Sequence, residues 1–300
     1  MVPCIKIKSK TMVIYQASTF AGVYEELLND LINDPEYTTQ PRDMKINEIC
    51  DVSLVIENPL SCLYSNPFRS SQFKYIAAEF LWYFMGRNDV EYISKYAKFW
   101  ESIKNDDDTV NSSYGHLLFN NKNEHGITQY LWALESLAKD KDSRQAVLHF
   151  NLPIHQQSDN KDFVCTMYGI FQIRNNKLNF TVSMRSNDVI LGLPTDVAFF
   201  VTLQSQMLSH LRTHAGYPEL ELGTYTHIAN SSHIYERHFE IAKNMIIKKF
   251  EPIQIPEVNL DLINIDGTPT DNFIALFNNQ DESLVLEDGL YNWILNNINL

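Results

Sequence analysis

The chain has 300 residues, 44% of them hydrophobic, which is enough apolar material to bury one large core. Its 24 basic residues against 37 acidic ones give a net charge of -13, which argues against a polynucleotide partner because phosphate backbones are bound mainly by dense lysine and arginine. A few arginines still suffice for one small phosphate, and the lack of a membrane-length apolar run or signal-peptide core predicts a cytoplasmic protein without a membrane partner.

The chain begins with a predicted strand and a predicted helix. Residues 1–16 alternate enough to predict a strand in an N-terminal extension. No repeat, low-complexity stretch or Pro/Gly-rich linker divides residues 17–300, which are therefore predicted to form a single domain. The stretch STFAGVYEELLNDLIND has a Ser/Thr start and apolar residues at helical spacing, which predicts a helix from about Thr19 to Ile32.

Later stretches predict further helices and a hairpin. In SSQFKYIAAEFLWYFMGRND, Ser70 or Ser71 can cap a helix, and Gly86 suits the left-handed position that ends it. LWALESLAKDKDSRQAVLHF predicts a helix, a charged turn and a strand, and the next segment predicts a hairpin around Asn175-Asn176. DVAFFVTLQSQMLSHLRTH has no charged residue after its first until Arg212, which predicts a long buried helix, followed by a strand, a polar turn and a helix. Hairpins beside segregated helices indicate an α+β fold.

One of the four cysteines is a candidate nucleophile. The set shows no CxxC or His/Cys ligand spacing, so reduced thiols and no metal site are expected. Cys165 lies in a strand-like run, where a cysteine is most often a small core hydrophobe. To act as a nucleophile, its thiol, with an ordinary pKa of about 8.5, needs cations nearby, and Arg185 across the hairpin is a plausible source.

Other polar side chains leave two interpretations open. Glu79 interrupts an apolar helix and either points to solvent or faces inward, where burial raises its pKa and makes it a candidate proton shuttle. Arg185 and Ser186 either offer a fork and a hydroxyl to a phosphate or occupy an exposed turn. His233 and Tyr235 share one face if extended, where they either donate to a sugar hydroxyl or simply end a strand.

Several stretches, in order from about Arg42 to about His238, resemble the thymidylate synthase family. They are EFLW with Glu79, SSYGHL with Tyr114, DSRQ with Arg144, FVCTMY with Cys165, RSNDVILGLPTD with Arg185, and HIY with His233. Trp100 in KFW matches an aromatic residue on the folate side of the family's cavity. Several ordered motifs at matching spacing make chance agreement implausible.

The resemblance implies a fold, an activity and a set of roles. The fold is a large mixed or antiparallel sheet with flanking helices around a long buried helix, paired as a homodimer through the sheet face. The activity is C5 modification of a pyrimidine nucleoside monophosphate, dCMP or CMP, with 5,10-methylenetetrahydrofolate as co-substrate and no metal. The implied roles are nucleophile for Cys165, proton transfer for Glu79 and Tyr114, phosphate binding for Arg42, Arg185, Ser186 and Arg144 of the partner subunit, sugar binding for His233 and Tyr235, and folate contacts for Asp188, Trp100 and Glu79.

The base-reading position departs from the family pattern. Where thymidylate synthases have an asparagine that pairs with O4 and N3-H of uracil, this chain has Asp196. A carboxylate can accept from the N4 amino group of cytosine and share or supply the proton at N3, which also activates C6 toward the thiolate. It would meet uracil O4 with opposed lone pairs. Asp196 therefore predicts a cytosine nucleotide and has a base-reading, catalytic role.

Other departures bear on the last chemical step. The chain resembles the deoxycytidylate hydroxymethylases of bacteriophages, which carry MRSND, the same aspartate and a threonine after the nucleophile, here Thr166. In those enzymes water rather than hydride completes the reaction, and Ile103, in place of a second tryptophan, is compatible with this. Gln145 replaces the second arginine of the family's RR, and the carboxy terminus lacks the closing Pro-x-Ala-Val tail.

We therefore expect a deoxycytidylate 5-hydroxymethyltransferase that converts dCMP, 5,10-methylenetetrahydrofolate and water into 5-hydroxymethyl-dCMP and tetrahydrofolate. Alternatives are a dCMP C5-methylase, which shares every step except the last, and a CMP hydroxymethylase of nucleoside biosynthesis. A catalytically inactive nucleotide-binding homologue is motivated by Gln145 and the altered tail. Retention of Cys165, Glu79, Tyr114 and Asp188 argues against it, because a binding protein needs no nucleophile.

Overall fold

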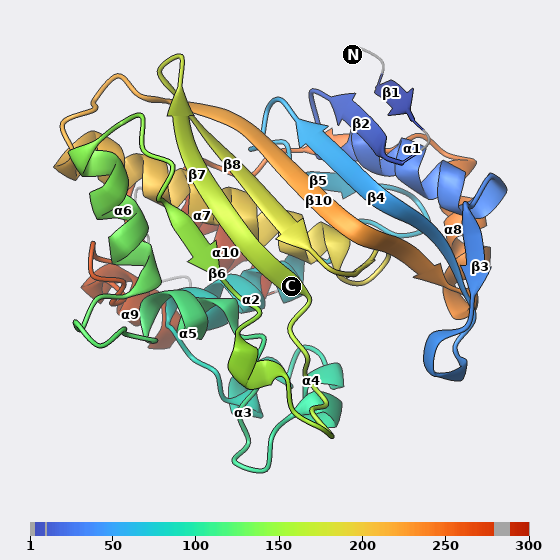
Figure 1. Cartoon of the computed structure of the whole chain (residues 1–300), viewed down its shortest axis with the longest axis horizontal. Coiled ribbons are helices and arrows are strands. Elements are labelled where there is room, and N and C mark those ends of the chain that lie inside the picture. Colours follow the sequence, from blue (N-terminus) through green and yellow to red (C-terminus); the bar gives the residue numbers. More distant parts are fainter. Residues whose placement is uncertain (1–3, 10, 279–288, 300) are drawn as a thin grey trace. The chain divides into compact units, whose positions relative to one another are not determined.

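Helices and strands are mixed along the chain in the computed structural model, which describes residues 4–9, 11–278 and 289–299 (Figure 1). The strands are β1 (Ile5–Lys8), β2 (Val13–Ala17), β3 (Tyr37–Thr39), β4 (Ile46–Ile56), β5 (Leu63–Ser65), β6 (Val147–His149), β7 (Thr166–Arg174), β8 (Lys177–Met184), β9 (Asn187–Asp188), β10 (Glu221–Tyr235) and β11 (Glu251–Ile253). The helices are α1 (Phe20–Asn33), α2 (Phe73–Phe84), α3 (Val90–Ile93), α4 (Phe99–Ile103), α5 (Tyr114–Phe119), α6 (Gln129–Lys139), α7 (Leu193–His214), α8 (Phe239–Ile246), α9 (Asp271–Asn278) and α10 (Gly289–Ile298).

The main sheet is mixed. Its strands follow the order β1-β2-β4-β10-β8-β7-β6, with β3 paired to β4 and β9 paired to β10. β2 runs parallel to β4 and β9 parallel to β10, whereas β1–β2, β3–β4, β4–β10 and β6–β7 are antiparallel pairs. β5 and β11 form a separate antiparallel pair. The predicted α+β class and mixed sheet with flanking helices are confirmed.

The chain divides into two compact units whose segments interleave. Unit 1 comprises Met1–Ser71, Asn179–Val201 and Leu222–Ile255, and unit 2 comprises Gln72–Leu178, Thr202–Glu221 and Pro256–Leu300. The single domain predicted for residues 17–300 stays a prediction.

Unit 1 is organised around α1, which packs against β2, β4 and α8. Thr19 begins this helix, and its hydroxyl accepts a hydrogen bond from the backbone N–H of Gly22 at 3.3 Å. Such a cap satisfies a donor that the first helical turn leaves without a partner. On the buried face, Tyr24 stacks on Tyr64 with ring centroids 4.9 Å apart. The predicted helix start at Thr19 is confirmed.

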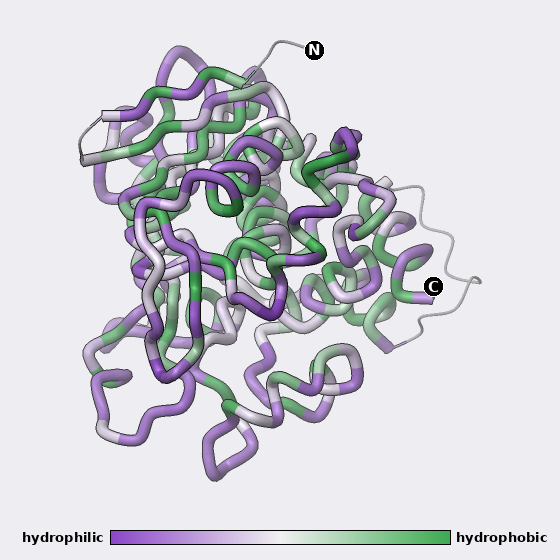
Figure 2. The backbone as a smooth tube through the Cα atoms, turned by 90° about the vertical axis from the view of Figure 1, so that its right-hand side faces the viewer, coloured by the Kyte–Doolittle hydropathy of each residue, from purple (hydrophilic) through white to green (hydrophobic). Residues whose placement is uncertain are grey.

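The N-terminal extension contains β1 and most of β2. β1 alternates isoleucine and lysine, as the alternating green and purple tube near the N-terminus shows (Figure 2). Lys6 forms an ion pair with the buried carboxylate of Asp30 in α1, and the Tyr15 hydroxyl donates to the same carboxylate. Burial and Asp30 raise the pKa of Tyr15 far above its ordinary value, so the phenol remains a donor. The extension, of which residues 1–3 and 10 lie outside the described set, is thus anchored on α1.

Unit 2 contains α2 and the hairpin of β7 and the start of β8. α2 is followed by Gly86 at φ +66°, the left-handed position predicted to end it. Asn175 and Asn176 have φ values of 51° and 58°, which confirms the predicted hairpin turn. α10 packs against α2, and residues 287, 288 and 300 of the tail segment lie outside the described residues.

α7 is the predicted long buried helix, and its side chains are almost entirely buried from Val197 to Leu211. A helical segment without an exposed side chain must have packing partners on all sides. Within residues 4–9, 11–278 and 289–299, no helix has the length and apolar character needed to cross a membrane.

The predicted serine cap of α2 is wrong. Gln72 occupies the cap position and makes no side-chain capping hydrogen bond. The Ser71 hydroxyl instead accepts from the backbone N–H of Tyr64 at 3.0 Å, and the Ser70 hydroxyl accepts from the backbone N–H of Asn66 at 3.1 Å. Both hydroxyls therefore stabilise the turn that precedes the helix. A hydroxyl oxygen that accepts these turn hydrogen bonds is not available to cap the helix.

Gly115, at the start of α5, lies against the backbone of α2. A Cβ atom added there would come 1.8 Å from the carbonyl oxygen of Tyr83, and backbone cannot move aside as a flexible side chain can. We expect Gly115→Ala to lower the free energy of unfolding by about 3 kcal/mol or more through overpacking. Urea unfolding checks this. Gly126→Ala is the matched control, because its Cβ would meet nothing within 4 Å and only its positive φ of 77° would be strained, by about 1 kcal/mol. Equal stability of the two variants would contradict the prediction.

Candidate active site

Cys165 lies immediately before β7, not inside a strand as its sequence context suggested. The residue is half-buried. Cys62 in unit 1, by contrast, is fully buried, and burial raises the pKa of its thiol far above the ordinary value. The interpretation as an inert core cysteine therefore fits Cys62, whereas Cys165 combines partial exposure with a position at a strand end.

Tyr114 and the residue after Cys165 are brought together in unit 2. The fully buried Thr166 hydroxyl donates to the Tyr114 hydroxyl at 2.8 Å. The Tyr114 ring stacks on Tyr83 of α2, with centroids 5.4 Å apart and planes 21° apart. A phenol fixed by both stacking and a hydrogen bond has little freedom to reorient. The structure thus places one predicted proton-transfer residue in contact with the residue that follows the predicted nucleophile in the sequence.

Glu79 faces inward, which decides between the two interpretations that its sequence context left open. It is 5% exposed, and the Tyr75 hydroxyl donates to its Oε1 at 2.7 Å. Tyr75 in turn accepts a hydrogen bond from the indole Nε1 of Trp100 at 2.9 Å. This Trp100–Tyr75–Glu79 chain joins two predicted site residues through one that sequence analysis missed, because a tyrosine on the apolar face of a helix looks like core.

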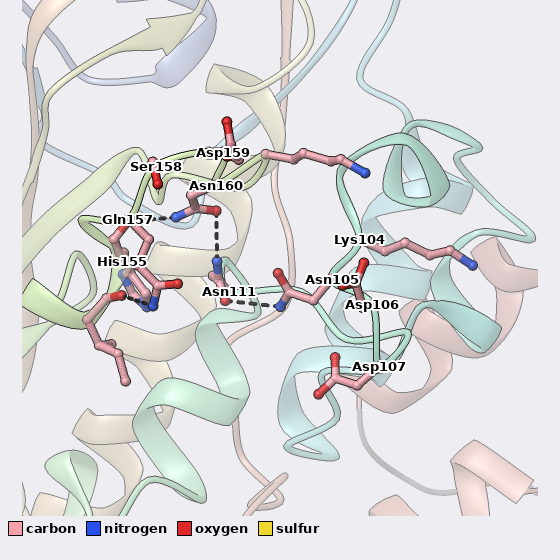
Figure 3. Close-up of a pocket in the computed structure, with 12 residues that line it drawn as sticks. Lys104, Asn105, Asp106, Asp107, Asn111, His155, Gln157, Ser158, Asp159 and Asn160 are labelled. Atoms are coloured by element: carbon pink, nitrogen blue, oxygen red, sulfur yellow. Dashed lines mark hydrogen bonds between the residues drawn. The ribbon is translucent and has the colours of Figure 1, made fainter.

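A polar hollow of about 530 Å³ also lies in unit 2, between residues 104–111 and 154–161 (Figure 3). Asn111 bridges its two sides, donating to the Asn160 side-chain oxygen at 3.1 Å and accepting from Asn105 at 3.2 Å. The predicted site residues do not line this hollow. One of its walls, residues 154–161, belongs to the loop that leads to Cys165.

Asp162 fixes that loop. Its carboxylate accepts from the backbone N–H of Ser112 at 2.7 Å and from the Ser112 hydroxyl at 2.6 Å, and its backbone carbonyl accepts from Asn111 at 3.0 Å. Ser112 lies two residues before Tyr114, and Asp162 three residues before Cys165. The carboxylate therefore ties together the segments that carry both predicted catalytic residues. Asp162 stands in a polar, loop-like stretch of sequence, where nothing distinguishes it from a solvated acid.

Unit 1 holds all of the residues predicted to bind the nucleotide except Arg144, together with Asp188, one of the predicted folate contacts. Arg185 and Ser186 follow β8 directly and are half-buried, and β9 then pairs in parallel with β10 so that Asp188 lies opposite His233. One oxygen of Asp188 accepts from the backbone N–H groups of Ile190 and Leu191 at 2.9 and 3.0 Å. The carboxylate is thereby held in one orientation.

His233 and Tyr235 share one face of β10, as their spacing predicted if the segment was extended. Their rings meet edge to face with centroids 5.2 Å apart. Burial lowers the pKa of His233, against the opposing effects of the Asp188 and Glu48 carboxylates, and the Arg42 guanidinium lowers it further. The imidazole is therefore neutral near neutral pH and can donate a hydrogen bond from one nitrogen to a hydroxyl.

Asp196 lies in the first turn of α7 and is half-buried. Its Oδ2 accepts from the side-chain amide of Asn187 at 2.9 Å. The N-terminal turn of a helix favours negative charge, because its backbone N–H groups lack partners within the helix. The carboxylate thus has both a favourable field and a fixed donor. Asn187 was not singled out in the sequence, because it is a middle letter of a motif whose other members carry the recognisable chemistry.

Two predicted phosphate ligands are exposed. Arg42 lies in a short 3-10 turn (Pro41–Asp43) with φ 51°, and Arg144 follows α6 beside Gln145. Arg144 also borders a hollow of about 710 Å³ in unit 2 that includes Trp132. Exposure leaves both guanidinium groups accessible to another molecule. Arg185 and Cys165 belong to different units, so activation of the thiol by Arg185 stays a prediction.

A buried tyrosine–histidine pair lies near Asp196 in unit 1. The Tyr225 hydroxyl and His227 Nδ1 are 2.9 Å apart, and burial together with Asp196 raises the pKa of Tyr225 well above its ordinary value. Burial lowers the pKa of His227 from 6.5 to about 3. The folded protein therefore resists protonating His227, whereas the unfolded chain does not.

This shift predicts acid sensitivity. A histidine with a lowered folded-state pKa contributes stability that is present above pH 6.5 and is lost as the pH falls toward about 3. Between pH 7.5 and 5.5 the loss from His227 is about 1.4 kcal/mol. Urea unfolding at both pH values should show a smaller loss in His227→Gln by about that amount, and an unchanged loss in the exposed control His125→Gln. The same loss in His227→Gln as in the wild type would contradict the assignment.

The family model described as thymidylate synthase matches residues 24–284, which is most of the chain. The chain belongs to the thymidylate synthase family. It is therefore an enzyme of folate-dependent one-carbon transfer to C5 of a pyrimidine nucleotide. The resemblance inferred from the motifs is confirmed.

Two phage relatives of this thymidylate synthase family member have equal identity. The deoxycytidylate 5-hydroxymethyltransferase of Enterobacteria phage T4 is 28% identical over 213 residues, covering 69% of this chain and 83% of the relative. The deoxyuridylate hydroxymethyltransferase of Bacillus phage SP01 is 28% identical over 234 residues, covering 75% of this chain and 59% of the relative. By name, the two relatives act on different bases.

A solved structure shows the same fold. The thermostable thymidylate synthase A from Bacillus subtilis superposes with a TM-score of 0.62 at 22% identity, covering 78% of this chain and 85% of that one. At that identity the likeness establishes the thymidylate synthase-like fold alone. The fold therefore does not distinguish between the two bases, and the preference depends on individual side chains.

Proposed function

We propose that this family member is a deoxycytidylate 5-hydroxymethyltransferase, which forms 5-hydroxymethyl-dCMP and tetrahydrofolate from dCMP, 5,10-methylenetetrahydrofolate and water. The observation that carries the proposal is the Asp196 carboxylate with the Asn187 amide donating to it at 2.9 Å. Because the two phage relatives act, by name, on different bases, overall similarity supports hydroxymethylation without selecting cytosine. Asp196 supports cytosine.

The base preference follows from hydrogen-bond chemistry. Cytosine presents an N4 amino donor where uracil presents the O4 acceptor. An ionised carboxylate accepts only. Asp196 therefore pairs with the N4 amino group, whereas uracil O4 brings two acceptors together and leaves both without a donor, which disfavours dUMP. Asn187, by donating to Oδ2, supports the ionised form of Asp196.

The reaction begins at the Cys165 thiolate. Its sulfur forms a bond to C6 of the pyrimidine, and the C5–C6 π electrons move to C5, which becomes nucleophilic. Bound 5,10-methylenetetrahydrofolate would supply the one-carbon unit: a bond would form from C5 to its methylene carbon, the bond from that carbon to the folate nitrogen would break, and tetrahydrofolate would leave before water adds to the same carbon. Glu79, oriented by Tyr75, accepts the proton that leaves C5 and orients the water that becomes the hydroxymethyl oxygen. The sulfur leaves C6 at the end, which restores the ring.

The remaining predicted residues bind the substrates. Arg185, Ser186 and Arg42 hold the 5′-phosphate, with charge-assisted hydrogen bonds that suit planar guanidinium groups. His233 and Tyr235 hold the sugar hydroxyl from one face of β10. Asp188 and Trp100 suit the folate, because backbone donors fix the carboxylate and Tyr75 fixes the indole ring. A pterin offers both donors and a flat surface to such a pair.

Arg144 is proposed to reach the phosphate from the second subunit of a homodimer formed through the sheet face. Its exposure in the single chain is consistent with that role. We expect Cys165→Ala and Arg144→Ala to be nearly inactive separately and to regain activity when their subunits are exchanged, because one of the mixed sites then has both intact residues. Turnover of the mixture measures this. No recovery, with heterodimers demonstrated by differently tagged chains, would contradict Arg144 acting across the interface.

The proposed reaction is tested by product mass. Purified protein is incubated with 5,10-methylenetetrahydrofolate and either dCMP, CMP or dUMP, and each product is identified by mass spectrometry. We expect hydroxymethylated dCMP and no growth of dihydrofolate absorbance. A methylated product with dihydrofolate would identify a methylase, a product from CMP would identify a ribonucleotide enzyme, and turnover of dUMP alone would overturn the cytosine assignment.

A further inference from the structure

The side-chain hydrogen bonds of Asn187 differ from those of an ordinary buried asparagine. The residue is 3% exposed, and β9 fixes its backbone by pairing Asn187 with Ser232 on β10. Its Nδ2 donates to Asp196 Oδ2 at 2.9 Å, yet its Oδ1 is buried without a hydrogen-bond partner among the described residues. A buried amide that satisfies only its donor side is an exception among buried polar groups.

Asn66, in the same unit, shows the structural alternative. It is also 3% exposed, but its Nδ2 donates to the carbonyl of Met245 at 3.0 Å and its Oδ1 accepts from the backbone N–H of Phe68 at 3.0 Å. Both ends of that amide stabilise backbone. Asn187 is an equally buried asparagine, so the two residues differ in the groups that their side-chain amides bind.

The acid at position 196 dictates the orientation of the Asn187 amide. The two side chains are 2.9 Å apart at Nδ2 and Oδ2, and a flipped amide would oppose two oxygens at that distance. Gly192 encloses the pair, because an added Cβ would lie 3.3 Å from Asp196 Oδ2 and 3.4 Å from Asn187 Nδ2. The two side chains are therefore closely packed. The amide nitrogen of Asn187 donates to the carboxylate, and in this orientation its Oδ1 accepts no hydrogen bond from the described residues.

We propose that Asn187 is a specificity-determining positioning residue, which holds the Asp196 carboxylate ionised and in one orientation so that it accepts from the amino group of a cytosine nucleotide. The inference rests on the proposed function, since it assumes that Asp196 reads the base. It extends the base-reading element from one residue to a pair. A neutral amide donor suits this task, because a cationic donor would itself pair with the carboxylate and weaken its interaction with the base.

Two substitutions test the pair. Asn187→Asp keeps the shape but places two carboxyl groups at hydrogen-bond distance, where they retain one proton between them and can donate as well as accept. Uracil O4 then meets a donor, and we expect the dCMP-to-dUMP ratio of kcat/KM to fall at least about tenfold. Asn187→Ala removes the amide donor to the carboxylate, and we expect KM for dCMP to rise about tenfold with little change in kcat. Equilibrium binding of dCMP and dUMP reads the same preference without turnover.

A double-mutant cycle separates positioning from folding. If Asn187 acts through Asp196, the effect of Asn187→Ala on the base ratio disappears in an Asp196→Asn background. Asn66→Ala is the matched control, expected to lower stability and leave the base ratio unchanged. An unchanged ratio in both Asn187 variants, or an effect of Asn187→Ala that persists in the Asp196→Asn background, overturns the inference.

Failure of the proposed function gives a different result. If the wild type binds dCMP in preference but forms no hydroxymethyl product, the reaction assignment fails and the binding ratios still test Asn187. If the wild type prefers dUMP, both the cytosine assignment and the inference are overturned. If the wild type hydroxymethylates dCMP and the Asn187 variants keep its base preference, the inference alone is wrong.

Discussion

Replacement of Cys165 by alanine is expected to lower kcat for dCMP at least about ten-thousand-fold, while the affinity for dCMP changes less than about tenfold. In the proposed reaction the thiolate forms the covalent bond that makes C5 reactive, and no other group is proposed for that role. In the proposed site the nucleotide is bound mainly through phosphate, sugar and base contacts rather than through the sulfur. Loss of the sulfur therefore removes an interaction that exists during reaction far more than in the bound ground state.

Release of tritium from C5 of labelled dCMP measures this step directly. Cys50→Ala is the matched control, because Cys50 is also half-buried but burial and the Glu48, Glu36 and Asp51 carboxylates raise the pKa of its thiol. That variant should release tritium at the wild-type rate. Equal release by Cys165→Ala and the wild type would exclude covalent catalysis through Cys165.

The sequence predicted the elements whose signals are local. Thr19 caps α1 and Asn175-Asn176 form the hairpin turn, because a capping hydroxyl and two residues tolerant of positive φ act within a few positions of chain. The long helix α7 was predictable because it has no charged residue between Asp196 and Arg212. Ser70 and Ser71 were predicted wrongly as caps, since their hydroxyls bond to Asn66 and Tyr64, and sequence alone does not rank such competing partners.

The candidate site likewise contains residues that the sequence reveals and residues that only the structure reveals. Glu79, Tyr114, Cys165 and Asp196 were recognisable because each stands within a motif of the family. The residues that hold them were not. Asp162 and Ser112 are 50 positions apart, and Tyr75 is recognisable as a partner only once Trp100 is seen to contact it. Support of this kind depends on long-range packing, and its residue types are common in loops and cores.

Asp196→Asn is the prediction with the most direct bearing on the substrate. We expect kcat/KM for dCMP to fall about a hundredfold or more and that for dUMP to rise, so that the preference inverts. An asparagine offers one donor and one acceptor, which matches O4 and N3-H of uracil, whereas the carboxylate offers acceptors only. Loss of the carboxylate also removes the charged acceptor for the N4 amino group, so cytosine is held less firmly in the reactive position and the fall for dCMP should appear in kcat as well as KM.

Competition between dCMP and dUMP in one reaction, with products separated by mass, measures the inversion. Asp261→Asn is the control, because Asp261 accepts from Gln206 and Ser209 in unit 2 and has no predicted contact with the base. It should lower stability without changing the base ratio. If Asp196→Asn retained the wild-type ratio, neither the Asp196 carboxylate nor the Asn187 amide that holds it could be the element that reads the base, because the Asn187 effect is transmitted through Asp196.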